Sequence, residues 1–160
     1  MSIDTTKVSD RRTLRFESLD AALTDAERLV KQPCRTLGNW TLGQNLDHLA
    51  RTVRIGLEGP HILASWFARI LIAPFVKKRF ITKSMPAGFQ FTKQMEPYRP
   101  EDQAVAVAAL EELRKQYSRL SRESPSVHHP FLGPLTHEEW LGMHLRHAEL
   151  HLSFLVPEAA

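Results

Sequence analysis

The chain has 160 residues, of which 42% are hydrophobic and 24% charged, and its formal net charge is +3. This length favours a single domain over residues 1–160 with one core. The basic residues are dispersed, and no zinc-finger, RNA-binding or phosphate-loop motif is present, so nucleic-acid binding is not expected. The lone cysteine cannot form an internal disulfide, and the N-terminal sequence has no apolar signal-peptide core, so we expect a cytoplasmic protein.

Four segments carry apolar residues at helical spacing, which predicts helices over about 18–32, 41–57, 101–122 and 136–155. Ser18 or Asp20 can cap the first helix, and Pro33 ends it. Thr136 and Glu139 have the spacing of a capping box at the start of the last helix. The only strand-like piece is the sequence TLRF at 13–16. These patterns predict an all-α fold, a bundle of four main helices.

A long connection, from about 61 to 95, separates the second and third predicted helices. Its apolar run is interrupted by Arg69 and Pro74 and closed by basic residues at 77–79. A transmembrane helix needs about 20 apolar residues, so this run is too short and too broken to be one. We expect a packing helix that covers the bundle or a second copy in a homodimer. An amphipathic lid or a membrane-surface element is the alternative.

The last predicted helix places His144, His147 and His151 along one edge, because spacings of three and four residues return a side chain to nearly the same face. An apolar stripe runs beside them and consists of Leu141, Leu145, Ala148, Leu152 and Leu155. His147 and His151 form an i, i+4 pair, which can chelate one metal ion from a single helix. The alternative is that these histidines bond to water and to carboxylates such as Glu149.

His48 has a similar position on the second predicted helix. It belongs to a polar stripe beside the apolar face, formed by Thr41, Asn45, His48 and Thr52. Taken alone, such a histidine is more often a hydrogen-bonded structural residue than a ligand. Together with His147 and His151, it would provide three neutral nitrogen ligands and leave coordination positions open for water or substrate.

The order of these features resembles the DinB-like family of metal-binding four-helix proteins: Trp40, then His48 and Leu49, then the HxxxH pair near the C-terminus. The segments RRTLRFESLDAAL, NWTLGQNLDHLA and HHPFLGPLTHEEWLGMHLRHAELHL resemble an uncharacterised subfamily of that group, over nearly the whole chain. The resemblance implies a DinB-like bundle with a long helical insertion at about 61–95. It also implies that His48, His147 and His151 hold one metal ion.

The chain departs from the subfamily pattern near the last ligand. Leu150 and Phe154 stand where that pattern has a second histidine and a glutamine, so the polar surroundings of the ligands are expected to differ. His144 matches no family ligand, and a structural role is favoured for it. The alternative is that His144 moves a proton. It is the only residue that we consider as a catalytic candidate. Glu111 or Glu112 could supply a carboxylate that orients a ligand histidine.

Other residues near these segments are not expected to be ligands. His128 and His129 lie in a loop flanked by Pro130 and are expected to face solvent or to cap a helix end. Cys34, beside Pro33, is expected to be a passive residue of an inter-helix turn rather than a reactive thiol.

Two functions are consistent with this pattern. One is a metal-dependent enzyme resembling the thiol transferases of the wider family, in which a divalent metal lowers the pKa of a low-molecular-weight thiol. The other is a non-catalytic metal-binding or interaction protein. The sequence shows no Ser-His-Asp arrangement or paired carboxylates, so hydrolysis would need a metal-activated water. Imidazole ligands suit zinc, nickel, copper and iron alike. Enzyme-like chemistry is favoured.

Overall fold

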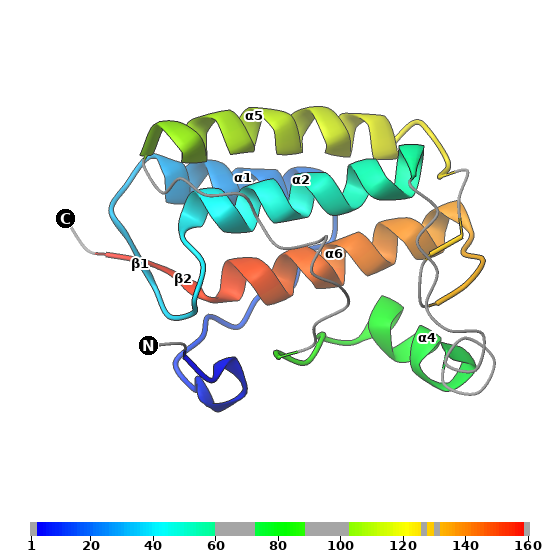
Figure 1. Cartoon of the computed structure of the whole chain (residues 1–160), viewed down its shortest axis with the longest axis horizontal. Coiled ribbons are helices and arrows are strands. Elements are labelled where there is room, and N and C mark those ends of the chain that lie inside the picture. Colours follow the sequence, from blue (N-terminus) through cyan, green and yellow to red (C-terminus); the bar gives the residue numbers. More distant parts are fainter. Residues whose placement is uncertain (1–2, 60–72, 89–102, 126–127, 130–131, 159–160) are drawn as a thin grey trace.

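The computed structural model describes residues 3–59, 73–88, 103–125, 128–129 and 132–158. Within these ranges the chain is mostly helical, which confirms the all-α class. The long helices α1 (Leu19–Val30), α2 (Leu42–Glu58), α5 (Gln103–Leu120) and α6 (His137–Ser153) lie alongside one another (Figure 1). Residues 61–72 and 89–95 of the predicted insertion lie outside the described ranges.

Side-chain caps set where the helices begin. Ser18 accepts a hydrogen bond from a backbone N–H of the first turn of α1, as predicted. Thr136 and Glu139 form the predicted capping box of α6, and Thr41 and Gln44 form another at α2. Each cap satisfies a backbone N–H that has no partner within the helix. The two helices that begin with a capping box, α2 and α6, are those that carry the three candidate ligands.

The core lies between the long helices and is mostly aliphatic. Its fully buried members include Leu29, Leu46, Leu49, Leu113, Leu120 and Leu152. Two glycines of α2 allow neighbouring helices to come close. A Cβ added at Gly43 would lie 3.1 Å from the backbone nitrogen of Ala106 in α5, and one added at Gly56 would lie 3.1 Å from the Trp140 ring in α6. Close packing therefore fixes the position of α2 relative to both α5 and α6.

A small antiparallel sheet joins β1 (Cys34–Thr36) to β2 (Leu155–Pro157). α6 therefore ends two residues before the predicted end at about 155. The helix stops at Ser153 because the residues after Phe154 pair with β1 instead of extending the helical hydrogen bonds. The strand-like segment 13–16 forms no strand: there the backbone N–H of Phe16 donates to Glu149 and its carbonyl accepts from Arg146.

Arg146 and Glu149 attach the N-terminal segment to one side of α6. They form a 2.8 Å ion pair in which each side chain is only 3% exposed. Burial raises the pKa of Glu149, and the hydrogen bond from Phe16 partly offsets this effect. Two residues turn an α-helix by about 200°, so Glu149 points away from both His147 and His151. The alternative that Glu149 serves as a partner of these histidines is wrong.

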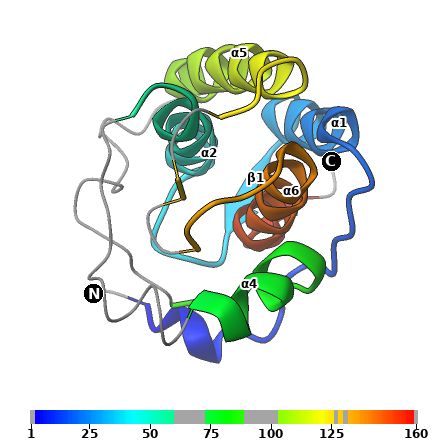
Figure 2. The same ribbon diagram turned by 90° about the vertical axis from the view of Figure 1, so that its right-hand side faces the viewer.

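A shorter helix, α4 (Ala73–Thr82), lies outside the four long helices and packs against α6 (Figure 2). Phe80 anchors it in the core, and Lys77 forms a 2.8 Å ion pair with Glu139 at the start of α6. Phe75 points outward and is 85% exposed. None of the helices in the described part of the chain combines the length and the apolar character needed to cross a membrane.

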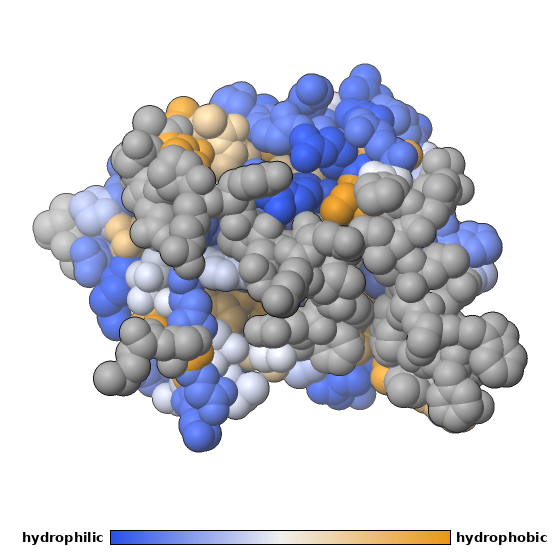
Figure 3. All heavy atoms as spheres, viewed as in Figure 1, coloured by the Kyte–Doolittle hydropathy of each residue, from blue (hydrophilic) through white to orange (hydrophobic). Residues whose placement is uncertain are grey.

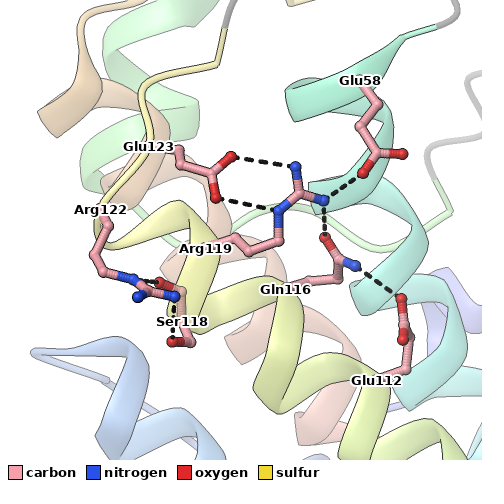
Figure 4. Close-up of polar contacts among 7 residues, drawn as sticks. All are labelled: Glu58, Glu112, Gln116, Ser118, Arg119, Arg122 and Glu123. Atoms are coloured by element: carbon pink, nitrogen blue, oxygen red, sulfur yellow. Dashed lines mark hydrogen bonds and ion pairs between the residues drawn. The ribbon is translucent and has the colours of Figure 1, made fainter.

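Polar contacts join the C-terminal ends of α2 and α5. Arg119 lies between Glu58 and Glu123 and also donates to Gln116, which in turn donates to Glu112 (Figure 4). These ion pairs are solvent-exposed, so each is expected to contribute little to stability. The surface over the C-terminal half of α5 is hydrophilic (Figure 3). The C-terminal half of α5 is therefore a hydrophilic surface.

Candidate metal site

Three histidines from two helices converge between α2 and α6. His48 comes from α2, and His147 and His151 come from successive turns of α6. One ring nitrogen from each lies within 4.8 Å of the other two. The Nε2 atoms of His48 and His147 are 3.2 Å apart. Two nitrogens bound to one tetrahedral zinc ion at about 2.0–2.1 Å lie roughly 3.3 Å from each other, so these side chains could hold a metal ion.

Helical spacing explains the convergence. His147 and His151 are four residues apart, and their ring centroids are 4.6 Å apart. His48 lies on the polar stripe of α2, which faces this edge of α6, and its ring centroid is 4.6 Å from that of His151. The structure thus brings together the three residues that the sequence singled out.

The other ring nitrogens of the α6 pair contact polar side chains of α2. The Nδ1 atom of His151 is 3.0 Å from Oδ1 of Asn45, and the Nδ1 atom of His147 is 3.5 Å from Oγ1 of Thr52. Sequence reasoning did not assign these roles to Asn45 and Thr52. Their shared position with His48 on one polar stripe was the available signal. Both partners are neutral oxygens rather than carboxylates.

Trp40 forms one wall of the site. Its ring stacks on His151, with centroids 5.3 Å apart and an angle of 13° between the planes, and it lies 4.8 Å from His48. Sequence reasoning used Trp40 only as a family marker. The structure shows that this side chain restricts two of the three imidazole rings.

Burial keeps the two candidate ligands of α6 neutral. Burial holds the pKa of His147 well below its usual 6.5, and the neighbouring His151 and His48 lower it further. Burial also lowers the pKa of His151, with His48 as a second cause. A cation among these rings would take the place of the protons that burial excludes. Neutral imidazole is the form of histidine that binds metal ions.

His144 does not join the other three histidines. It is 1% exposed and stacks on Trp140, and its ring centroid is 6.5 Å from that of His147. Burial, together with His129, lowers the pKa of His144 to about 3, so this ring is neutral and a poor proton acceptor near neutral pH. Its Nε2 atom has no hydrogen-bond partner among the described residues. These observations favour a structural role.

The remaining candidates also lie outside the histidine cluster. His128 is exposed. His129 accepts a hydrogen bond from the backbone of Leu132 and packs 5.5 Å from Trp140. Burial lowers the pKa of His129 to about 4.

The suggestion that Glu111 or Glu112 orients a ligand is wrong. Glu111 pairs with Arg114, and Glu112 contacts Arg54 and Gln116. Neutral Asn45 and Thr52 occupy the places beside the α6 histidines.

Cys34 is half-buried in β1, and burial raises the pKa of its thiol. A raised pKa keeps the thiol protonated and unreactive at neutral pH. The structure therefore favours the passive role that the sequence predicted, although the residue lies in a strand rather than in a turn.

A family model described as a protein of unknown function (DUF1569) matches residues 8–158. The match includes both helices of the site and the strands β1 and β2. No curated protein and no solved structure gives a significant match.

Proposed function

The chain belongs to the DUF1569 family, and we propose that it binds one divalent metal ion through His48, His147 and His151. The observation that carries this proposal is the convergence of three imidazole nitrogens from two packed helices. A hydrogen bond between His48 and His147 would satisfy only one pair of nitrogens. The third imidazole is that of His151, which Asn45 and Trp40 hold in place. A cation shared by all three rings would explain why His151 also lies in the cluster.

The donor set fits a divalent transition metal. Three imidazoles suit zinc, nickel, copper or iron, and such a set leaves at least one coordination position for another ligand. The imidazoles are neutral, so they leave the charge of the ion uncompensated. Such a site favours a small anion as the additional ligand.

We extend the proposal to the family that the sequence resembles: a single DinB-like four-helix domain that acts on a low-molecular-weight thiol. A divalent metal, when bound, supplies a positive charge that lowers the pKa of a thiol at neutral pH. The chain itself would hold the ion with three histidines and shield it with Trp40. Cys34, with its raised pKa and its place in β1, is not the reactive sulfur in this proposal.

Metal analysis of protein made without an affinity tag tests the proposal. We expect about one equivalent of a divalent metal, which is released only at a pH well below 6.5, because burial holds the pKa values of His147 and His151 below that value. Elemental analysis and zinc titration of chelator-treated protein measure the stoichiometry. Protein that neither retains a metal nor takes up zinc, nickel or iron when titrated would contradict the proposal.

The thiol chemistry has a separate test. Metal-loaded protein is expected to accelerate alkylation of a small thiol about tenfold or more at pH 7, because a thiol of pKa near 8.5 is only a few per cent ionised there. The thiol proton passes to the solvent, a sulfur–carbon bond forms, and the bond between that carbon and its leaving group breaks, so the leaving group departs as an anion. Glutathione, bacillithiol, mycothiol and simple thiols form the test panel, and product formation is measured with loaded and chelator-treated protein.

The Cys34→Ser variant is the control, and its rate should equal that of the wild type. If no thiol of the panel shows a metal-dependent rate or metal-dependent binding, the non-catalytic metal-binding function replaces the transferase.

A further inference from the structure

Asn45 has a fixed amide orientation. Its Nδ2 atom donates to the carbonyl oxygens of Trp40, at 3.2 Å, and Thr41, at 2.8 Å. Both partners can only accept, so the NH₂ group must face them and Oδ1 must face His151. An amide oxygen is also only an acceptor. The 3.0 Å contact therefore requires a proton on Nδ1 of His151, and the neutral ring then has its lone pair on Nε2.

Thr52 constrains His147 in the same way. Its hydroxyl lies 2.9 Å from the carbonyl oxygen of Leu49, which accepts the hydroxyl proton. Only the lone pairs of Oγ1 then remain for the longer, 3.5 Å contact with Nδ1 of His147. His147 therefore also carries its proton on Nδ1 and has a lone pair on Nε2.

This assignment determines the state of His48 before metal binding. Nε2 of His147 has a lone pair, so the 3.2 Å contact between the two Nε2 atoms is a hydrogen bond only if His48 supplies the proton. A metal ion bound to both nitrogens would displace that proton from Nε2 of His48. His147 and His151 would need no change of protonation.

We infer that Asn45 and Thr52 are positioning residues that lock His151 and His147 in the tautomer with Nε2 free for a metal, and that His48 alone changes tautomer on metal binding. The role of Asn45 and Thr52 in metal binding rests on the proposed metal site. The tautomers themselves are properties of the metal-free protein. Metal-ligating histidines commonly have their second nitrogen fixed by such a neighbour.

Long-range ¹H–¹⁵N NMR of the histidine rings in metal-free, full-length protein at pH 7.5 tests the tautomers directly. We expect Nδ1–H on His147 and His151, Nε2–H on His48, and loss of the His48 Nε2–H form when one equivalent of Zn²⁺ is added. An Nε2–H form of His147 or His151 in the metal-free protein would overturn the inference. This result can be read even if zinc does not bind, so failure of the metal proposal is a separate outcome.

Zinc affinity of Thr52→Val, measured by competition with a chelator, provides a second readout. Valine keeps the shape but removes the oxygen acceptor, and the affinity is expected to fall 10–100-fold. Thr52→Ser should restore it. Thr24→Val is the matched control, because Thr24 of α1 makes a similar bond to the carbonyl oxygen of Asp20. Unchanged zinc affinity and unchanged His147 tautomer in Thr52→Val would overturn the role of Thr52.

Asn45→Ala tests the other positioning residue. Its zinc affinity should fall by a similar factor, and the His151 ring should no longer be held in the Nδ1–H form. Asn45 also bonds the start of α2, so the unfolding midpoint of the metal-free variant is measured alongside. A folded Asn45→Ala protein with wild-type affinity and an unchanged His151 tautomer would overturn the role of Asn45.

Discussion

Replacing His147 or His151 with alanine is expected to abolish stoichiometric metal binding. Each substitution removes one of three ligand nitrogens that lie within 4.8 Å of one another. Substitutions of residues that only orient a ligand already cost 10–100-fold in affinity, so loss of a ligand should cost more than about 100-fold. His48→Ala should have the same effect, although this ligand lies on a different helix. Elemental analysis of tag-free protein and zinc competition with a chelator measure the loss.

His144→Ala is the matched control on the same helix. His144 lies along the same edge of α6, but its ring stacks on Trp140 and is not part of the convergent set. We expect this variant to keep its metal even though truncation of a buried side chain lowers its stability. Circular dichroism verifies that each variant is folded. If the three ligand variants all retained the full metal content, the assignment of the site would be wrong.

The sequence predicts the helices of the site because their signals are local. Helical spacing of leucines and the pair Thr136 and Glu139 define α6 within a few residues, and the structure contains that capping box. The i, i+4 spacing also places His147 and His151 on one face. Pairing them with His48 required the polar stripe of α2 and the family resemblance, because spacing within one helix says nothing about its neighbour.

The errors concern contacts between distant parts of the chain. β1 and β2 have three residues each, and their pairing joins Cys34 to Pro157, which no local pattern predicts. The segment 13–16 alternates like a strand, but its backbone partners are the side chains of Arg146 and Glu149.

The partners of the ligand histidines could not be predicted for a similar reason. Asn45 was visible on the polar stripe, yet the direction of its amide depends on the two carbonyl groups at the start of α2. From the sequence alone, the glutamates of α5 were equally plausible partners of the ligand histidines. Only packing shows that they face other residues.

The metal-free protein is expected to lose stability steeply as the pH falls from 6.5 to 5. Burial lowers the pKa of His129 to about 4 and that of His144 to about 3, and it holds the pKa values of His147 and His151 well below 6.5. These rings stay neutral in the folded protein, whereas the unfolded chain takes up protons below about pH 6.5. The stabilisation is therefore complete above that pH and is lost as the pH falls toward the folded pKa values.

The slope of the free energy of unfolding against pH follows from the number of protons that the unfolded chain takes up and the folded protein does not. Well below pH 6.5, each histidine that is charged only in the unfolded chain costs about 1.4 kcal/mol per pH unit. Four such residues would remove several kcal/mol by pH 5, out of a total stability of about 5–15 kcal/mol for a typical domain. Burial raises the pKa of Asp25, but hydrogen bonds from Arg12 and Arg28 outweigh it, so the net pKa lies below 3.8. The contribution of this carboxylate is lost at lower pH than that of the histidines.

Urea unfolding of chelator-treated protein at several pH values between 7.5 and 5 measures this dependence. A His144→Leu variant keeps an apolar side chain of similar size in the buried position but removes one titrating group. Its slope should therefore be smaller by about 1.4 kcal/mol per pH unit. Equal stabilities at pH 7 and pH 5 would show that these histidines titrate alike in the folded and unfolded chains. The lowered pKa values ascribed to these histidines in the folded protein would then be wrong.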